Sequence, residues 1–187
     1  MSVDQMSLFT ALLSLLAGAI AVVGALLLAT PTGRHRLRTL RTEAVRLSWT
    51  VAVVATAGSL WFSEVGGFVP CEYCWYQRIL MYPLVVVLGV ATWVRGAGPE
   101  GQGVGFLRWQ ALPFSVAGLV LSGYHVQLQW FPEQGSSCDV KAPCTQQWVD
   151  EFGFVSIPVM AFLGFAAVTV LVLAATFRED ADVEQER

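Results

Sequence analysis

The hydrophobic positions of the 187-residue chain fall in long runs that are separated by short polar segments. Runs without any Asp, Glu, Lys or Arg cover residues 6–30, 47–63, 79–94, 109–132 and 152–177. About 20 helical residues cross a hydrocarbon core of roughly 30 Å, so each run suffices once flanking residues extend the second and third. Because a backbone in lipid must satisfy its own hydrogen bonds, these spans are expected to be helices. The pattern predicts an all-α integral membrane protein with five transmembrane helices.

The composition supports this interpretation. Hydrophobic residues make up 55% of the chain and charged residues only 13%, whereas a soluble domain carries roughly 25% charged residues. The basic cluster between the first two runs consists of Arg34, Arg36, Arg38, Arg41 and Arg46. Such a cluster is compatible with nucleic-acid binding, but between apolar runs it indicates a cytoplasmic loop, residues 31–46. No nucleic-acid partner is therefore expected.

The first run has two interpretations, a signal peptide or a retained transmembrane helix. The residues before it contain no Lys or Arg and include Asp4, which is unusual for the start of a signal peptide. Residues 6–30 also exceed the usual length of a signal-peptide hydrophobic core. A retained helix is the favoured expectation.

The order of the spans predicts the location of the four cysteines. With the Arg-rich loop in the cytoplasm, Cys71 and Cys74 follow one span later and lie outside. Cys138 and Cys144 follow after two further spans and lie outside as well, where disulfides form and persist. The loop 95–108, which carries two arginines, falls on the cytoplasmic side.

The Cys-x-x-Cys pair at Cys71 and Cys74 admits several chemistries. Together with Cys138 and Cys144 it has a spacing that is possible for zinc, although nothing nearby resembles a compact zinc ribbon. Covalent haem attachment would need a histidine at position 75, where the chain has Trp75. Structural disulfides and a redox-active pair are the remaining interpretations, and the redox pair is preferred.

Two features favour redox chemistry. Cys74 is expected at the start of the helix through residues 79–94, where the helix dipole stabilises a thiolate. Arg78 follows one turn later and adds a positive charge on the same side. Its guanidinium either extends to the lipid headgroups or supports the thiolate and binds a polar oxygen of a lipid-soluble ligand.

The electrons of such a pair need an acceptor. The chain has no dinucleotide-binding fingerprint and no large soluble domain, so a membrane quinone with a carbonyl near Arg78 is the expected acceptor. His125, near the outer end of the fourth run, either donates a hydrogen bond to the quinone or relays a proton, or it simply binds a backbone carbonyl. In the last outer loop, Trp148, Val149 and Phe152 would share one face of a helical turn, which predicts a short interfacial helix after Cys144.

Three motifs in order resemble the disulfide bond formation protein B (DsbB) family, and most closely its short BdbC-like branch from Gram-positive bacteria. The first motif is CEYCWYQR at residues 71–78, followed by ILMYP. The second is HVQLQWFP at residues 125–132 with Ser-Cys-Asp at 137–139, and the third is Pro-Cys-Thr at 143–145 with FGF and Ile-Pro at 152–158. The resemblance covers roughly residues 47–177.

The resemblance implies a multi-pass protein of the bacterial cell membrane that reoxidises an extracytoplasmic thioredoxin-like thiol oxidase of the DsbA or BdbD type. Electrons then pass to quinone, either menaquinone or ubiquinone. By position, Cys71 and Cys74 resemble the pair that exchanges with quinone, with Cys74 nearest to it. Cys138 resembles the cysteine that the partner attacks, and Cys144 its mate. Arg78 and His125 resemble quinone-site residues, and Gln77 is assigned to the same site.

The implied organisation is an extra N-terminal helix and basic loop in residues 1–46, a four-helix bundle in 47–177 and an acidic cytoplasmic tail in 178–187. The extra helix departs from the four spans of the family, and the loop cysteines lie closer together than in Gram-negative members. A vitamin K epoxide reductase-like protein is the rival within redox enzymes, although its redox pair follows the loop pair. A structural membrane protein with two loop disulfides is the rival from another class.

Overall fold

The computed structural model describes residues 2–93, 104–134, 138 and 142–176 and confirms an all-α architecture. The long helices are α1 (Val3–Ala29), α3 (Arg41–Glu64), α4 (Glu72–Trp93), α5 (Val104–Trp130) and α6 (Ile157–Thr176). Two short elements are added, α2 (Pro31–Thr39) and the 3₁₀ turn η1 (Pro132–Gln134). The five long helices are long and apolar enough to cross a membrane, as the sequence predicts.

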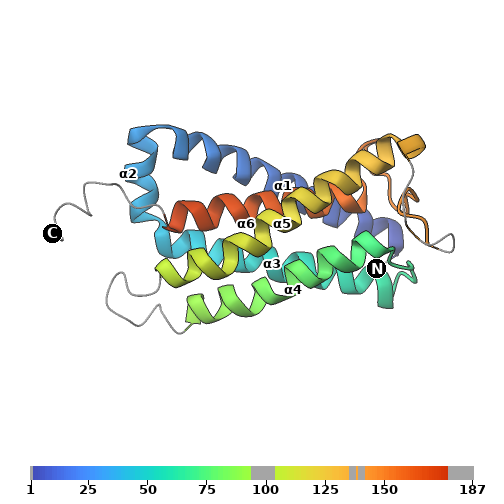
Figure 1. Ribbon diagram of the computed structural model, residues 1–187, viewed down its shortest axis with the longest axis horizontal. Coiled ribbons are helices and arrows are strands. Elements are labelled where there is room, and N and C mark those ends of the chain that lie inside the picture. Colours follow the sequence, from blue (N-terminus) through green and yellow to red (C-terminus); the bar gives the residue numbers. More distant parts are fainter. Residues whose placement is uncertain (1, 94–103, 135–137, 139–141, 177–187) are drawn as a thin grey trace.

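The long helices lie side by side along the molecule, and α2 crosses one end of it (Figure 1). Helix α6 contacts α1, α3 and α5, while α4 completes the bundle against α3 and α5. The main core lies between α3, α4, α5 and α6 and includes Leu84, Leu88, Phe165, Val168 and Val172. Figure 1 places the N-terminus and the loops after α3 and α5 at the end opposite to α2; this end is called the cysteine end below.

The Arg-rich connection between the first two spans, residues 31–46, is largely helical. Thr30 caps α2, since its side-chain oxygen accepts a hydrogen bond from the backbone N–H of Gly33 at 3.2 Å. Pro31 occupies the first position of α2, where its fixed φ suits a helix and its missing N–H costs nothing. Helix α3 then starts at Arg41, so that basic residues extend from α2 into its first turns.

The prediction of a short interfacial helix after Cys144 is wrong. Residues 151–155 instead form a turn that is closed by a bridge between Glu151 and Val155. Phe152 and Gly153 have φ values of 58° and 75°, in the left-handed region that a right-handed helix excludes. The last apolar run therefore becomes helical only at Ile157, with Pro158 in the first turn of α6. The acidic tail and most of the loop 95–108 lie outside the described residues.

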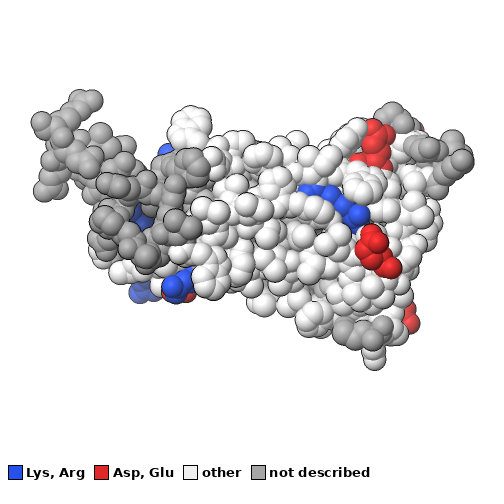
Figure 2. Space-filling view, turned by 90° about the horizontal axis from the view of Figure 1, so that it is seen from below, with Lys and Arg blue, Asp and Glu red and all other residues white. Residues whose placement is uncertain are grey.

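Charge is distributed unevenly between the two ends. Figure 2 shows acidic side chains at the cysteine end of the face in view and Lys or Arg side chains at the opposite end, with one further basic patch near the acidic side chains. The arginines of α2 and the start of α3 lie far from the cysteine loops along the bundle. The positive-inside rule relates such an excess of Lys and Arg at one end of a helical bundle to the cytoplasmic side of the membrane.

Candidate functional site

The start of α4 positions the Cys71 and Cys74 pair. The carbonyl of Cys71 accepts the N–H of Trp75 at 3.1 Å, so Cys71 lies just before the helix and Cys74 in its first turn. Their sulfur atoms are 3.0 Å apart and unbonded, as two thiols in contact. Cys71 is buried and Cys74 is half-buried. The pair therefore occupies the amino-terminal end of α4, as predicted for a redox pair.

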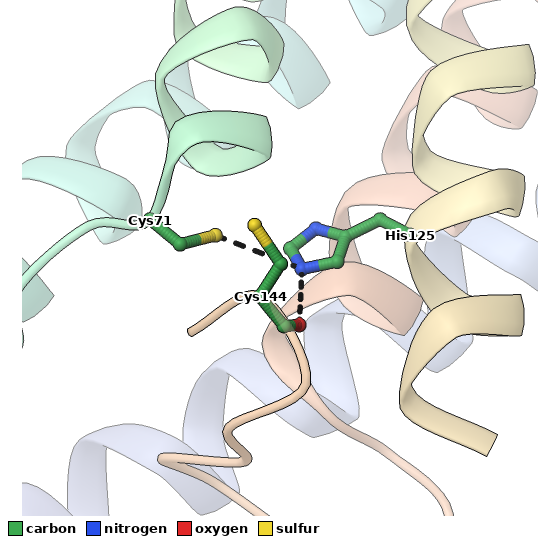
Figure 3. A group of neighbouring side chains, drawn as sticks. All are labelled: Cys71, His125 and Cys144. Carbon is green, nitrogen blue, oxygen red and sulfur yellow. Dashed lines mark hydrogen bonds between the residues drawn. The ribbon is translucent and has the colours of Figure 1, made fainter. Parts of the chain in front are cut away.

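The second pair is a disulfide in the loop between α5 and α6. Cys138 and Cys144 are joined, and Cys144 is only 1% exposed whereas Cys138 is half-buried. The Cys144 sulfur lies within 4.8 Å of both the Cys71 sulfur and a ring nitrogen of His125. Figure 3 shows the two sulfurs and the imidazole facing one another from α5, the start of α4 and the loop. One sulfur from each pair, that of Cys71 and that of Cys144, thus lies close to the other in a buried position.

His125 is the centre of this arrangement and is 1% exposed. Its Nε2 lies 3.0 Å from the carbonyl oxygen of Cys144 and 3.7 Å from the Cys71 sulfur, as drawn in Figure 3. Its Nδ1 lies 3.2 Å from the amide nitrogen of Gln77. Because a carbonyl only accepts and an amide nitrogen only donates, these partners fix the Nε2–H tautomer. The Nε2–H group therefore donates to Cys144 and points toward Cys71.

The charge of the reduced pair is influenced by these neighbours. The hydrogen bond with Cys74 and then the proximity of His125 lower the pKa of Cys71 to about 4, although burial acts in the opposite direction. A thiolate at Cys71 is the form that attacks disulfides. By distance alone, Cys71, His125 and Cys144 would also suit a metal ion. However, the Cys144 sulfur is bound to Cys138, and the donating Nε2–H of His125 has no free lone pair, so this arrangement suits thiol exchange.

A second anchor holds the loop to α5 one turn after His125. The side chain of Gln129 accepts a hydrogen bond from the Ser156 hydroxyl at 2.6 Å and donates to the carbonyl of Gln146 at 3.1 Å. Both side chains are buried. The sequence reasoning missed Gln129 and Ser156. The available signal was a polar side chain one helical turn after His125, on the same face of α5.

Arg78 is buried beside Cys74, and α3 holds it. Its Nε donates to the Ser59 hydroxyl at 3.0 Å, and its Nη2 donates to the Ser59 carbonyl at 2.8 Å. The guanidinium carbon lies 5.2 Å from the centre of a Trp75 ring, a cation–π distance. Ser59 was not found from the sequence because its partner comes from another helix. Within the described residues, Nη1 of Arg78 has no hydrogen-bond partner.

A cavity of about 270 Å³ opens beside Arg78 between α1, α3, α4 and α6. Polar groups of Ser59, Cys74, Gln77 and Arg78 line it, and most other lining side chains are apolar. Cys71 and His125 do not line this cavity but share a smaller one with Cys74 on the loop side. Cys74 therefore contacts both spaces, while His125 lies between the two cysteine pairs, away from the cavity.

Stacked aromatic rings lie at the cysteine end of the cavity. Phe62 stacks on Phe68 with ring centres 5.6 Å apart, and Phe68 stacks on Trp148 at 5.1 Å. These residues line the cavity and come from the end of α3, the loop before α4 and the loop before α6. Aromatic side chains therefore line the cavity at the cysteine end.

Comparison with known proteins places this chain in a family. The profile described as "Disulfide bond formation protein DsbB" matches residues 41–175. Disulfide bond formation protein C of Bacillus subtilis strain 168 is 41% identical over 125 residues, which are 66% of this chain and 85% of that protein. A probable disulfide formation protein of Oceanobacillus iheyensis is 45% identical over 131 residues, 67% of this chain and 83% of that protein.

A probable disulfide formation protein C 2 of Bacillus cereus strain ATCC 10987 is 36% identical over 141 residues, 75% of this chain and 96% of that protein. No solved structure matches the chain. Helices α1 and α2 precede the residues that the profile matches. The rival from the vitamin K epoxide reductases finds no support in these matches. The chain belongs to the DsbB family of disulfide bond formation proteins.

Proposed function

We propose that this disulfide bond formation protein reoxidises a thioredoxin-like thiol oxidase outside the cytoplasm and passes the electrons to a membrane quinone. The observation that carries the proposal is the position of Cys74 between two spaces. On one side its partner Cys71 lies within 4.8 Å of the Cys144 sulfur. On the other side Cys74 lines an apolar cavity together with Arg78.

The first exchange begins at Cys138, the less buried sulfur of the loop disulfide. A thiolate of the reduced partner attacks the Cys138 sulfur, and Cys144 leaves as a thiolate. The second thiol of the partner loses its proton and attacks the partner's first sulfur in the mixed disulfide, which releases Cys138. The partner leaves oxidised, and the loop pair holds two electrons.

The second exchange connects the two pairs. The Cys144 thiolate attacks Cys71 in the Cys71–Cys74 disulfide, and Cys74 leaves. Cys138 then attacks Cys144, which re-forms the loop disulfide and releases Cys71. The bonds in the structure, with the loop pair joined and the other pair as thiols, are those expected after this exchange. His125 donates to the carbonyl of Cys144 at 3.0 Å and keeps that sulfur next to Cys71.

The residues that line the cavity fit a quinone. Apolar side chains suit its ring and tail, and Nη1 of Arg78, which has no hydrogen-bond partner among the described residues, is a donor for a carbonyl oxygen. A bound quinone supplies an acceptor for two electrons and two protons. On the protein side, the Cys71 thiolate attacks the Cys74 sulfur, and two electrons leave Cys74 toward the cavity as the disulfide re-forms. The low pKa of Cys71 keeps this nucleophile in its thiolate form.

A reconstitution experiment tests the proposal. Purified protein is mixed anaerobically with a reduced thioredoxin-like oxidase and decylubiquinone or a menaquinone analogue, and quinol formation is followed by absorbance. We expect turnover to be lost in Cys74→Ser, while the loop disulfide is still reduced by the partner. Unchanged turnover in Cys74→Ser would contradict the assignment.

We also propose that the cysteine end faces the outside of the cell membrane. The support is the position of α2 and its arginines at the opposite end. In intact cells, a membrane-impermeant maleimide should label reduced Cys138 but not a cysteine introduced by Thr39→Cys, which is exposed in α2. Labelling of the reverse pattern would exclude this orientation.

A further inference from the structure

Helix α1 lies outside the residues that the family profile matches, yet it faces the cavity that Cys74 and Arg78 line. We propose that α1 forms one wall of the quinone site and sets the fit of the ring and tail there. This inference rests on the proposed function, because it assumes that the cavity binds quinone. It assigns a role to a helix that precedes the residues matched by the family profile.

The cavity-facing side of α1 is a continuous stripe. The residues of this stripe recur at helical spacing and are Thr10, Leu13, Ser14, Leu16, Ala17 and Ile20. Ten residues separate its ends, which corresponds to about 15 Å along the helix axis. The stripe therefore runs beside the cavity from the region of Cys74 toward the middle of the bundle. An elongated wall of this kind suits a ring with an attached isoprenoid chain.

Close packing fixes α1 against its neighbours on both sides of the cavity. A side chain on Gly18 would approach Leu163 of α6 to 2.9 Å, so the two helices touch there. Across the cavity, a side chain on Gly58 of α3 would lie 3.5 Å from the Thr10 methyl group. Helix α1 thus bridges α6 and α3 and stands where lipid would otherwise border the cavity.

The outer end of α1 is also tied to the cysteine loop. The Ser7 hydroxyl donates a hydrogen bond to a carboxylate oxygen of Glu151 at 2.5 Å, and Ser7 is buried. Glu151 belongs to the same loop as Trp148, whose ring lines the cavity. These contacts hold α1 in register with the aromatic rings at the cysteine end. The wall therefore has a defined position relative to Cys74.

A matched pair of substitutions tests the wall. Leu13 lines the cavity, whereas its neighbour Leu12 does not and is 52% exposed. Leu13→Trp should fill part of the site and raise the KM for decylubiquinone roughly tenfold, while Leu12→Trp should leave it unchanged. Reduction of the Cys138–Cys144 disulfide by the partner should be normal in both. Equal KM values for Leu13→Trp and the wild type would overturn the inference.

Photolabelling of the wild-type full-length protein gives an independent readout, because it does not depend on whether a variant folds. An azido-substituted benzoquinone with a decyl chain is bound, irradiated and located by mass spectrometry. Label on both the α4 segment around Cys74 and residues 3–29 supports the wall. Label near Cys74 without any on α1 refutes the wall alone. Label that is absent from both, or not displaced by excess decylubiquinone, refutes the quinone assignment itself and the wall with it.

Discussion

Replacing Gln129 by Met should slow the proposed exchange between the two cysteine pairs and leave the cavity beside Arg78 unchanged. The buried amide of Gln129 makes one hydrogen bond to the Ser156 hydroxyl and one to the Gln146 carbonyl, at 2.6 and 3.1 Å. These bonds join the cysteine loop to α5 on either side of the turn at residues 151–155. Methionine has a similar length but offers neither an amide donor nor a carbonyl acceptor, so both bonds are lost.

The size of the effect follows from the two bonds. A typical hydrogen bond contributes about 0.5–1.5 kcal/mol, so the loop loses about 1–3 kcal/mol of its preference for the docked position. That difference lowers the population with Cys144 beside Cys71 by a factor of about 5 to 150 relative to undocked forms. The exchange rate falls by nearly this factor when the wild-type loop spends only slightly more than half of its time with Cys144 beside Cys71. The decrease is smaller when the wild-type loop is almost always in that position.

The assay starts from protein with both pairs oxidised and adds reduced thioredoxin-like oxidase without quinone. Acid quenching and maleimide trapping then report, at each time, how many of Cys71 and Cys74 have become thiols. The control is Gln127→Met, the same change on an exposed position of α5 whose side chain donates a hydrogen bond to Gln134. Equal rates in Gln129→Met, Gln127→Met and the wild type would refute the view that the Gln129 amide holds the loop in place for exchange.

Two further predictions concern the cavity side of the pair. Arg78→Lys removes the two hydrogen bonds that the guanidinium donates to Ser59. Because bonds from a charged donor contribute about 1.5–3 kcal/mol each, the KM for quinone should rise at least about tenfold in steady-state assays. An unchanged KM would exclude Arg78 from the site. Since the pKa of Cys71 is lowered to about 4, its thiolate persists above that pH, and modification of Cys71 by methyl methanethiosulfonate should stay nearly constant from pH 8 to pH 5. Cys74→Ala, which removes the largest cause of the shift, should move the decline to higher pH; a rate that falls tenfold per pH unit below 8 in the wild type would contradict the lowered pKa.

Much of the architecture could be predicted because lipid imposes a simple rule on the chain. A charge-free run long enough to cross the membrane must be helical, and all five runs are helical across most of their length. Helical spacing also predicted that Cys74 and Arg78 would share a side of α4, and both line the cavity. Short-range periodicity is sufficient for these features, since each depends on residues within one helix.

Contacts between helices were beyond this kind of reasoning. The sequence gives no indication that Arg78 would bind Ser59, because the two residues come from different helices. The placement of α1 against α6 was equally hidden: apolar surface faces lipid as favourably as protein, so hydrophobicity does not select a partner. Small residues select it instead, and Gly18 and Gly24 allow α1 to approach the α6 side chains closely. The turn at Phe152 was missed because its apolar neighbours continue the hydrophobic run.

The four sulfurs differ in their exposure to solvent and to the apolar cavity, and this difference determines which reactant can reach each sulfur. Cys138 is partly accessible, Cys144 and Cys71 are buried, and Cys74 adjoins the apolar cavity. In the proposed relay, a water-soluble thiol and a lipid-soluble oxidant therefore never compete for the same atom. A water-soluble thiol would react at Cys138, and a lipid-soluble oxidant would react at Cys74.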